Sequence, residues 1–365
     1  MTGNGSTNAA ATEYAPTNSA AKEHVSAATE HVPTNSAATE HVSAATEHTP
    51  TISVVIPTYR RHDALARCLE AIARQTLAKH EFEVIVVDDG SGNPPRAVIE
   101  RVAAQLHITL LTRDNGGPGA ARNTGVAAAF GTWVAFTDDD CLPEPTWLAE
   151  LLHVATTHTT AHATAHTTAH ATAHTTAHTT ALVGGRVENA LTGNVFAEAS
   201  QLLTAWLRTW YSHPDRYARL TFTTNNMLFA REQFERIGGF DTTSLADTAE
   251  DRDLCDRWRA QGWPLVHAPH AVVKHAHRMS FGGFVAQHHN YGRGAVYFHR
   301  AAGRVPSQAR KPETLRFYFG LLQAPFTKHN PLRAFGYSLL LLLAQVAYVG
   351  GYFSERVFPI KQVRA

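Results

Sequence analysis

The stretch GTWVAFTDDDCLPEP, residues 131–145, places three adjacent carboxylates directly after a run of large apolar residues. The apolar run is typical of a buried strand, and Asp138, Asp139 and Asp140 follow where that strand is expected to end. Like charges repel, so the three carboxylates need a cation or a donor-rich ligand to compensate them. Because side chains alternate along a strand, we expect Asp138 and Asp140 to point the same way and Asp139 to be a bystander.

The same pattern, an apolar strand with polar residues at its end, occurs three more times upstream. The segments are ISVVIPTY (52–59) with Thr58 and Tyr59, FEVIVVDDGSG (82–92) with Asp88 and Asp89, and HITLLTRDN (107–115) with Asp114 and Asn115. Helical stretches such as RAVIERVAAQL and GPGAARNTGVAAAF separate the strands. This alternation predicts an α/β fold with parallel strands and helices on both faces of the sheet.

The carboxyl ends of parallel strands line one crevice, where ligands bind in open α/β sheets. We therefore expect the four polar clusters to converge on one site. A nucleoside diphosphate carried on Mg²⁺ or Mn²⁺ would suit facing carboxylates, because the metal takes oxygen ligands and bridges the phosphates. A dinucleotide fold is excluded, because IPTYRR after the first strand has no glycine and GGPGAARNTG follows the third strand.

Composition limits the classes of function. The 365 residues are 44% hydrophobic, enough for a sizeable core, and the formal net charge of +1 gives no electrostatic case for nucleic-acid binding. The cysteines Cys68, Cys141 and Cys255 are scattered, which suits a reducing compartment and predicts neither a disulfide framework nor a zinc knot.

Two biased segments differ from the rest of the chain. Residues 1–50 repeat a unit close to AATEHVPTNSAATEHVSA and contain few large apolar side chains, so we expect a disordered tail that is no secretory signal. Residues 156–180 place a histidine at every fourth position from His158 to His178. That spacing would stack imidazoles on a helix, but threonine disfavours helix, and we expect a solvated low-complexity loop.

The second half of the chain offers a further acidic pair. RLTFTTNNMLFARE (219–232) is typical of a strand that enters a helix, and Gly238 and Gly239 would end that helix. AEDRDLCDRWRAQGW then begins another helix with Glu250 and Asp251, where the helix dipole favours negative charge. Plain helix capping is the alternative interpretation of this pair.

Six motifs in series carry a family resemblance. SVVIPTYRR, VIVVDDGS, GGPGAARNTG, FTDDD, GGFD and AEDRDLCDRW, in this order and spacing, resemble a family 2 glycosyltransferase with the GT-A fold. The resemblance covers residues 51–300 without the histidine tract. It implies a GT-A Rossmann-like mixed sheet flanked by helices.

The resemblance also implies roles for individual residues. PTYRR and Asp89 would hold the base and ribose with Asp88 beside them, Arg122 would approach the nucleotide, and Asp138 would reach the sugar. The full set implied for the nucleotide sugar is Pro57, Thr58, Tyr59, Arg61, Asp88, Asp89, Gly117, Arg122, Asp138 and Asp139. Turn formation ahead of Gly90 is the alternative role for Asp88 and Asp89.

The implied metal site contains Asp140 and His275, holding Mg²⁺ or Mn²⁺. His277 lies close enough in sequence to take the place of His275. His288 and His289 are expected to be ordinary surface or core histidines.

The implied reaction is an inverting displacement. Asp251 would act as the base that removes the proton of an acceptor hydroxyl, and the nucleoside diphosphate would leave on the metal's side. The donor would be a nucleoside-diphosphate sugar, and the acceptor a glycan or a lipid-linked molecule. Two alternatives remain. The first is a phosphohydrolase that uses the Asp triplet and would also need a lysine after it, and Lys274 is the only lysine between Lys79 and Lys311. The second is a non-enzymatic His-rich metal-binding protein.

Residues 301–365 are expected to form a membrane-associated region. Residues 334–354, AFGYSLLLLLAQVAYVGGYFS, carry no charge, and as a helix they would span about 31 Å, enough to cross a bilayer core. A buried or interfacial hairpin is the alternative. Since sugar nucleotides are cytosolic, we expect the catalytic domain on the cytoplasmic side of the cell membrane, with a single-pass or peripheral attachment.

Overall fold

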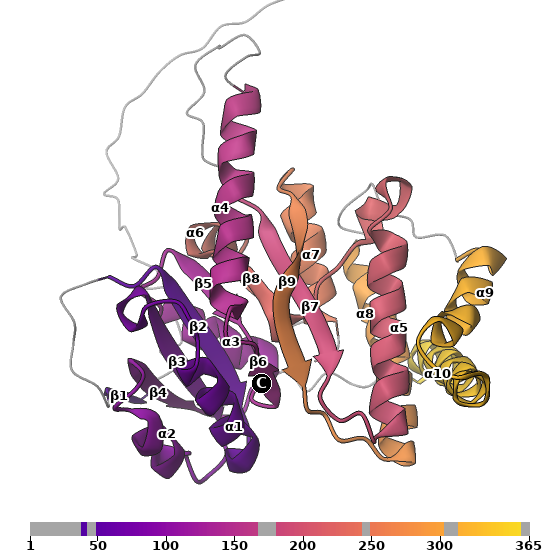
Figure 1. Cartoon of the computed structure of the whole chain (residues 1–365), viewed down its shortest axis with the longest axis horizontal. Helices are drawn as coiled ribbons and strands as arrows, with labels where there is room; N and C mark the ends of the chain where they lie inside the picture. Colours follow the sequence, from indigo (N-terminus) through magenta and orange to yellow (C-terminus); the bar gives the residue numbers. More distant parts are fainter. Residues whose placement is uncertain (1–37, 42–48, 167–179, 243–248, 303–312, 359–365) are drawn as a thin grey trace, which may run out of the picture. The chain divides into compact units, whose positions relative to one another are not determined.

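Alternating strands and helices build the first half of the computed structural model, as the sequence pattern predicts (Figure 1). The structure describes residues 38–41, 49–166, 180–242, 249–302 and 313–358. The strands are β1 (Ala38–His41), β2 (Ile52–Thr58), β3 (Phe82–Asp89), β4 (Ile108–Arg113), β5 (Trp133–Phe136), β6 (Cys141–Pro143), β7 (Leu182–Asn189), β8 (Met227–Ala230) and β9 (Leu265–His275).

The α-helices follow the strands and then dominate the last third of the chain. They are α1 (His62–Ala73), α2 (Arg96–Val102), α3 (Gly117–Ala127), α4 (Trp147–His166), α5 (Val195–Tyr211), α6 (Arg231–Arg236), α7 (Glu250–Ala260), α8 (Phe281–Ala302), α9 (Leu315–Gln323) and α10 (Pro331–Val357). Short 3₁₀ helices are η1 (Lys79–Glu81), η2 (Pro214–Arg219), η3 (Thr224–Asn226) and η4 (Ala324–Thr327).

Within the described residues the strands form one nine-stranded sheet in the order β1-β4-β3-β2-β5-β8-β7-β9-β6. Strands β4, β3, β2 and β5 run parallel to one another, and β8 pairs antiparallel with β5. The sheet is therefore mixed, and the parallel half ends at β5, directly before the Asp triplet.

Each face of the sheet has its own core, because neighbouring residues of a strand point to opposite faces. Val54 and Ile56 of β2 pack with α1, α2 and α4, whereas Val55 between them packs with α3 and α7. Gly125 lets α3 approach the sheet, since a Cβ there would lie 2.4 Å from a methyl group of Val55. Helices therefore cover both faces, as predicted (Figure 1).

Strand β6 carries the chain that follows the Asp triplet to the far edge of the sheet. It pairs antiparallel with β9, and Cys141 lies opposite His275 in that register. Asp140 directly precedes β6, so this pairing brings Asp140 and His275 together although 135 residues separate them.

Three segments differ from the sequence predictions. Residues 38–41, within the predicted disordered tail, form β1 on the edge of β4, whose backbone groups accept a further strand. The strand predicted from 219 begins only at Met227, because Leu220 and Phe222 are buried as loop residues and η3 intervenes. Helix α4 continues through residues 156–166, predicted as loop, although Thr157 and Thr159 bond back to the helix backbone, which slightly disfavours a helix. Residues 167–179 of the histidine tract, and 1–37 and 42–48 of the tail, lie outside the described residues.

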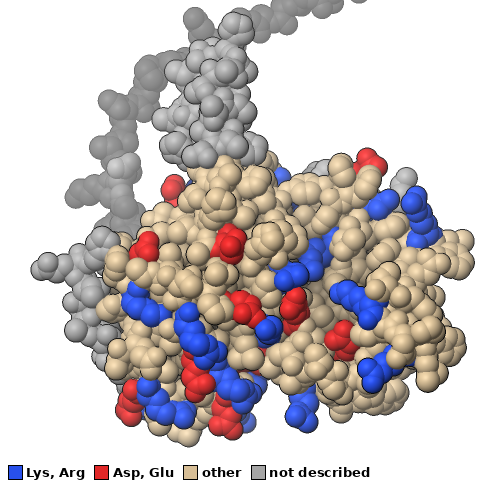
Figure 2. Space-filling model, in the orientation of Figure 1, with Lys and Arg blue, Asp and Glu red and all other residues tan. Residues whose placement is uncertain are grey.

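Helices α5, α8, α9 and α10 pack against one another beside β7 (Figure 1). Phe284 of α8 and Tyr337 of α10 lie in one shared core, and Phe317 of α9 and Leu341 of α10 lie in another. Among the described residues, α10 is the one helix long and apolar enough to cross a membrane. Lys, Arg, Asp and Glu side chains are interspersed over the face in Figure 2, in keeping with the small net charge.

Candidate active site

A cavity of about 520 Å³ lies at the carboxyl ends of the parallel strands, where the sequence predicts convergence. Its lining residues are Pro57, Thr58, Tyr59, Arg61, Asp89, Asn115, Gly117, Pro118, Arg122, Asp138, Thr223, Thr224, Asn225, Glu250, Asp251, His275 and Tyr291. The structure therefore brings most of the predicted site residues to one cavity. Asp88, Asp139 and Asp140 lie outside that lining.

Asp89 ends β3 and turns its carboxylate to the start of α3. It accepts hydrogen bonds from the backbone N–H of Gly116 (3.1 Å) and Gly117 (2.8 Å), and from the side-chain amide of Asn115 (3.3 Å). The helix dipole favours a carboxylate at this position. Gly117 has φ 84°, a conformation that strains residues with a side chain. These contacts fix Asp89 and Gly117 on the cavity wall.

Asp88 faces the turn instead of the cavity. Its carboxylate accepts hydrogen bonds from the backbone N–H of Ser91 (3.2 Å) and from the Ser91 hydroxyl. Gly90 completes the turn with φ 80°. The structure thus gives Asp88 the turn-forming role that the sequence left open as an alternative.

The Asp triplet does not continue the strand, because β5 ends at Phe136. Alternation along a strand therefore does not govern the three side chains, and that part of the prediction was wrong. Asp139 is nevertheless set apart: it is fully buried, accepts a hydrogen bond from the Thr58 hydroxyl (2.8 Å) and pairs with Arg61 (2.6 Å). Burial raises the pKa of Asp139 to about 6, although Arg61 and Thr58 act against the shift.

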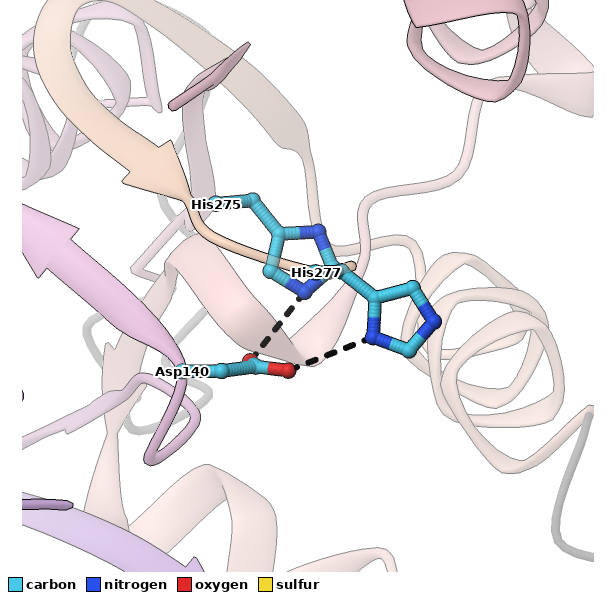
Figure 3. A group of neighbouring side chains, drawn as sticks. All are labelled: Asp140, His275 and His277. Carbon is cyan, nitrogen blue, oxygen red and sulfur yellow. Dashed lines mark hydrogen bonds and ion pairs between the residues drawn. The ribbon is translucent and has the colours of Figure 1, made fainter. Parts of the chain in front are cut away.

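Asp140 lies against two imidazoles (Figure 3). Its oxygens are 3.1 Å from Nε2 of His275 and 3.4 Å from Nδ1 of His277, and Nη1 of Arg61 is 2.8 Å away. Burial alone would raise the pKa of Asp140, but hydrogen bonds from His275 and His277 and the charge of Arg61 hold it well below its ordinary value. The same contact with Asp140 raises the pKa of His275 against the opposing effect of burial.

One carboxylate oxygen and two imidazole nitrogens converge here within 4.8 Å of one another, a donor set that fits a divalent cation. A second cluster combines Asp138, Asp140 and Cys141 at similar range. Burial raises the pKa of the Cys141 thiol well above its ordinary value, so this sulfur stays protonated and is a poor ligand. The first cluster, with both His275 and His277, is the better metal site.

Arg122 joins the two halves of the cavity. Its guanidinium pairs with Asp138 (2.7 Å) from the triplet and with Glu250 (3.3 Å) from the start of α7. Burial disfavours the charged guanidinium and by itself would lower the pKa of Arg122. The negative charges of Asp138 and Glu250 outweigh this effect and raise that pKa. Helix α3 therefore places a permanent cation between the acidic side chains.

Asp251 occupies the first turn of α7 and lines the cavity. Burial raises the pKa of Asp251 above its ordinary value, although the charges of Arg252 and Arg122 act against this shift. A carboxylate with a raised pKa is a stronger base than an ordinary one, which suits proton removal from a hydroxyl.

Sequence reasoning missed part of the cavity wall. Thr223, Thr224 and Asn225 line it from the segment before β8, and Tyr291 lines it from α8. The polar run TTNN directly before a buried strand could have indicated this part of the wall. In the other strands the polar residues follow the apolar run, whereas here they precede it. Tyr291 lies in the middle of a helix and offers no such signal.

The chain is similar to known glycosyltransferases. A family model described as Glycosyl transferase family 2 matches residues 53–216. The chain is 29% identical over 249 residues to the pre-mycofactocin glycosyltransferase of Mycobacterium tuberculosis, which covers 67% of this chain and 47% of that protein. It is 37% identical over 99 residues to glycosyltransferase AglE of Haloferax volcanii, which covers 27% of this chain and 33% of that protein. The chain thus spans between a third and a half of the length of these curated relatives.

A solved structure shares the fold. The mannosyltransferase PcManGT from Pyrobaculum calidifontis, solved in complex with GDP-Man and Mn²⁺, aligns with a TM-score of 0.55 and 19% sequence identity. The alignment covers 88% of this chain and 91% of that one.

Proposed function

The chain belongs to glycosyl transferase family 2, and we propose that it moves a sugar from a nucleoside-diphosphate sugar to a hydroxyl of an acceptor, with inversion at the anomeric carbon. The fold is GT-A, as the sequence resemblance implied. One observation carries the proposal: a single cavity holds Asp89 at the end of β3, Asp138 beside the metal cluster, and Asp251 on α7.

The donor would lie across the start of α3. Asp89 lines the cavity there, held by the backbone N–H groups of Gly116 and Gly117 and by Arg113 (3.4 Å), and its carboxylate would accept from a ribose hydroxyl in exchange for one of its longer contacts. Arg122, between Asp138 and Glu250, would attract the diphosphate. The GDP-Man in the Pyrobaculum protein supports a nucleotide sugar as the ligand class.

Asp140, His275 and His277 would hold a divalent cation. Two imidazoles favour Mn²⁺ over Mg²⁺, because Mg²⁺ prefers an all-oxygen shell. A cation held there would supply positive charge to offset the charge of the departing diphosphate. Oδ1 of Asp138 pairs with Arg122, but the side chain is 24% exposed, so its other oxygen would be left for the sugar end of the donor.

Asp251 would remove the proton of the acceptor hydroxyl as its oxygen attacks the anomeric carbon. The oxygen forms the new bond while the bond to the diphosphate breaks on the opposite side, so the configuration inverts. The proton passes to the carboxylate of Asp251, whose raised pKa makes it a competent acceptor. Glu250 pairs with Arg122 and is the less available carboxylate of the two.

The phosphohydrolase alternative finds less support. Its mechanism would need a lysine at the Asp triplet, and Lys274 instead pairs with Glu144 outside the cavity lining. The alternative of a His-rich metal-binding protein depends on a tract that lies mostly outside the described residues.

Thermal-shift measurements with nucleoside diphosphates, with and without Mn²⁺, test the donor site. We expect Mn²⁺-dependent stabilisation by at least one diphosphate, and we expect Asp140→Asn to remove that dependence because it deletes the shared carboxylate. Asp251→Asn should keep the stabilisation but lower sugar transfer by about 10²–10⁴-fold, since it removes only the base. Undiminished transfer by Asp251→Asn, or stabilisation by no diphosphate, contradicts the proposal.

A further inference from the structure

Helix α10 presents an apolar stripe to the outside along its whole length. Residues three and four apart share a helix face, and the exposed apolar residues of α10 follow that spacing. The stripe consists of Leu332, Phe335, Leu339, Leu342, Val346, Val349, Phe353 and Val357, with exposed fractions from 49% to 84%. So long a row of exposed large side chains needs a partner, because soluble monomers rarely expose large contiguous apolar patches.

The opposite face of α10 packs on the catalytic part of the chain. Tyr337 and Leu341 are buried among residues of α5, α8 and α9. Further along, the helix approaches α8 closely: a Cβ at Gly292 would overlap the carbonyl oxygen of Tyr348, and a Cβ at Gly351 would overlap that of His289. The helix is therefore docked from one end to the other.

A buried ion pair fixes the end of α10. Glu355 has no exposed surface and accepts hydrogen bonds from Arg293 (2.7 and 2.8 Å) and from the Tyr297 hydroxyl, both on α8. Near the other end, His329 lies 3.5 Å from Glu198 of α5. To cross a bilayer, α10 would have to take these charged groups into hydrocarbon or break every one of the contacts, and both are costly.

The charges around the stripe favour an anionic surface. Arg316, Lys328, Arg333 and Arg356 are exposed on the segment from α9 to the end of α10. Residues 314–358 contain one acidic residue, Glu355, and it is buried against Arg293. An apolar helix face with basic residues around it fits the boundary between lipid headgroups and acyl chains.

We propose that α10 lies in the plane of an anionic membrane surface, with its stripe in the headgroup region and its other face on α5 and α8. Helix α9 and η4, which pack against α10, add the exposed side chains of Leu315, Phe319 and Phe326. The chain is thereby held on the membrane without crossing it, in contrast to the bilayer-crossing helix predicted from residues 334–354.

This placement sets the cavity one helix away from the lipid. Tyr291 lines the cavity from α8, and the neighbouring Gly292 touches α10. Arg252, beside Asp251, interacts electrostatically with Tyr348 of α10. If the chain is a glycosyltransferase as proposed, this arrangement favours a lipid-linked acceptor whose hydroxyl reaches Asp251 from the membrane surface.

Vesicle flotation of the full chain tests the surface. The probes are vesicles of phosphatidylcholine alone and vesicles in which about a third is phosphatidylglycerol, an anionic lipid. We expect the protein to float with the anionic vesicles, to bind phosphatidylcholine vesicles at least about tenfold more weakly, and to be released by alkaline carbonate. Retention after carbonate treatment would mean that α10 crosses the bilayer and would overturn the proposal.

Two variants place the binding on the stripe. Leu339→Glu and Val346→Glu each put a negative charge at an exposed position of α10, and we expect binding to anionic vesicles to fall at least about tenfold. Phe130→Glu is the matched control, since Phe130 is as exposed (62%) as Val346 (62%) but follows α3. All three should unfold at the temperature of the unmodified protein, because the substituted side chains touch solvent.

Equal binding by all variants would overturn the proposal. Light scattering gives a second test. If the protein is a dimer, and Leu339→Glu converts it to a monomer without loss of vesicle binding, the stripe binds a second copy of the chain and the proposal is overturned. Flotation does not depend on the donor, so this result is separate from the proposed function. A chain that floats but is stabilised by no diphosphate would refute the function and leave the membrane surface intact.

Discussion

Three adjacent aspartates have three different environments. Asp138 faces Arg122 across the cavity, Asp139 is buried between Thr58 and Arg61, and Asp140 contacts two imidazoles. The sequence predicts that the triplet is a site, because its charges need compensation. It cannot predict which residue faces which partner, because the chain leaves the strand at Phe136 and the turn that follows sets the directions.

Asp251 leads to a prediction about pH. Its raised pKa means that the carboxylate takes up a proton at a higher pH than an ordinary aspartate, so kcat at saturating donor and Mn²⁺ should fall on acidification from a correspondingly higher pH. Arg252→Gln removes a positive charge that lowers the pKa of Asp251. We expect it to move the acidic limb of the kcat profile to still higher pH.

Arg257→Gln is the control for that profile. Arg257 lies on the same helix but pairs with Asp253 (2.6 Å). The acidic limb should stay in place in this variant. A limb that moves equally in both variants, or in neither, would show that Asp251 is not the group that titrates.

At the scale of elements, the strands and helices of the parallel half were predictable and the rest only in part. Periodicity of apolar residues identifies β2, β3, β4 and the helices between them, because each segment buries a regular face. The segment from 219 to 226 was misread as strand, since Leu220 and Phe222 are buried without joining a ladder. Burial of an apolar residue does not reveal whether its backbone pairs.

Helix α10 offers two neighbouring glycines with opposite expected effects. Gly351→Ala would force a Cβ into the carbonyl of His289, and we expect a loss of about 1–3 kcal/mol in the free energy of unfolding. At Gly350 the added Cβ meets a side-chain atom of His289 at an ordinary 4.0 Å. Gly350→Ala should therefore stabilise the protein by about 0.5–1 kcal/mol through helix propensity.

Denaturant unfolding of the two variants measures this difference. The pair share a residue type, a helix and a substitution, so only the packing distance to α8 distinguishes them. If Gly351→Ala is as stable as Gly350→Ala, α10 does not pack on α8 in the way described here.

At the scale of the whole molecule, the cavity and most of its lining residues could be predicted, but Tyr291 could not. Asp89 ends β3 and Asp138 follows the end of β5, where topology makes their meeting foreseeable. Tyr291 reaches the cavity only because α8 packs against α7, a tertiary arrangement without a local sequence pattern. The GT-A fold itself was confirmed.

The histidine tract is expected to be dispensable. Replacing residues 160–179 with a Gly/Ser linker of the same length keeps Thr180, which is buried, and removes the repeated imidazoles. We expect Mn²⁺-dependent stabilisation by nucleoside diphosphates to be unchanged, because Asp140, His275 and His277 lie elsewhere in the chain. Loss of that stabilisation in a folded variant would mean that the tract contributes to the metal site.

The pairing of β6 with β9 has a consequence for the newly made chain. A ribosome releases Asp140 long before His275, and the two meet only when β9 has joined the sheet at the edge that β6 occupies. Until then the growing polypeptide has strands β2 to β5 and Asp140, but neither of the two imidazoles of the cluster. The three-residue cluster of Asp140, His275 and His277 can therefore assemble only after β9, the last strand of the described sheet, has been synthesised.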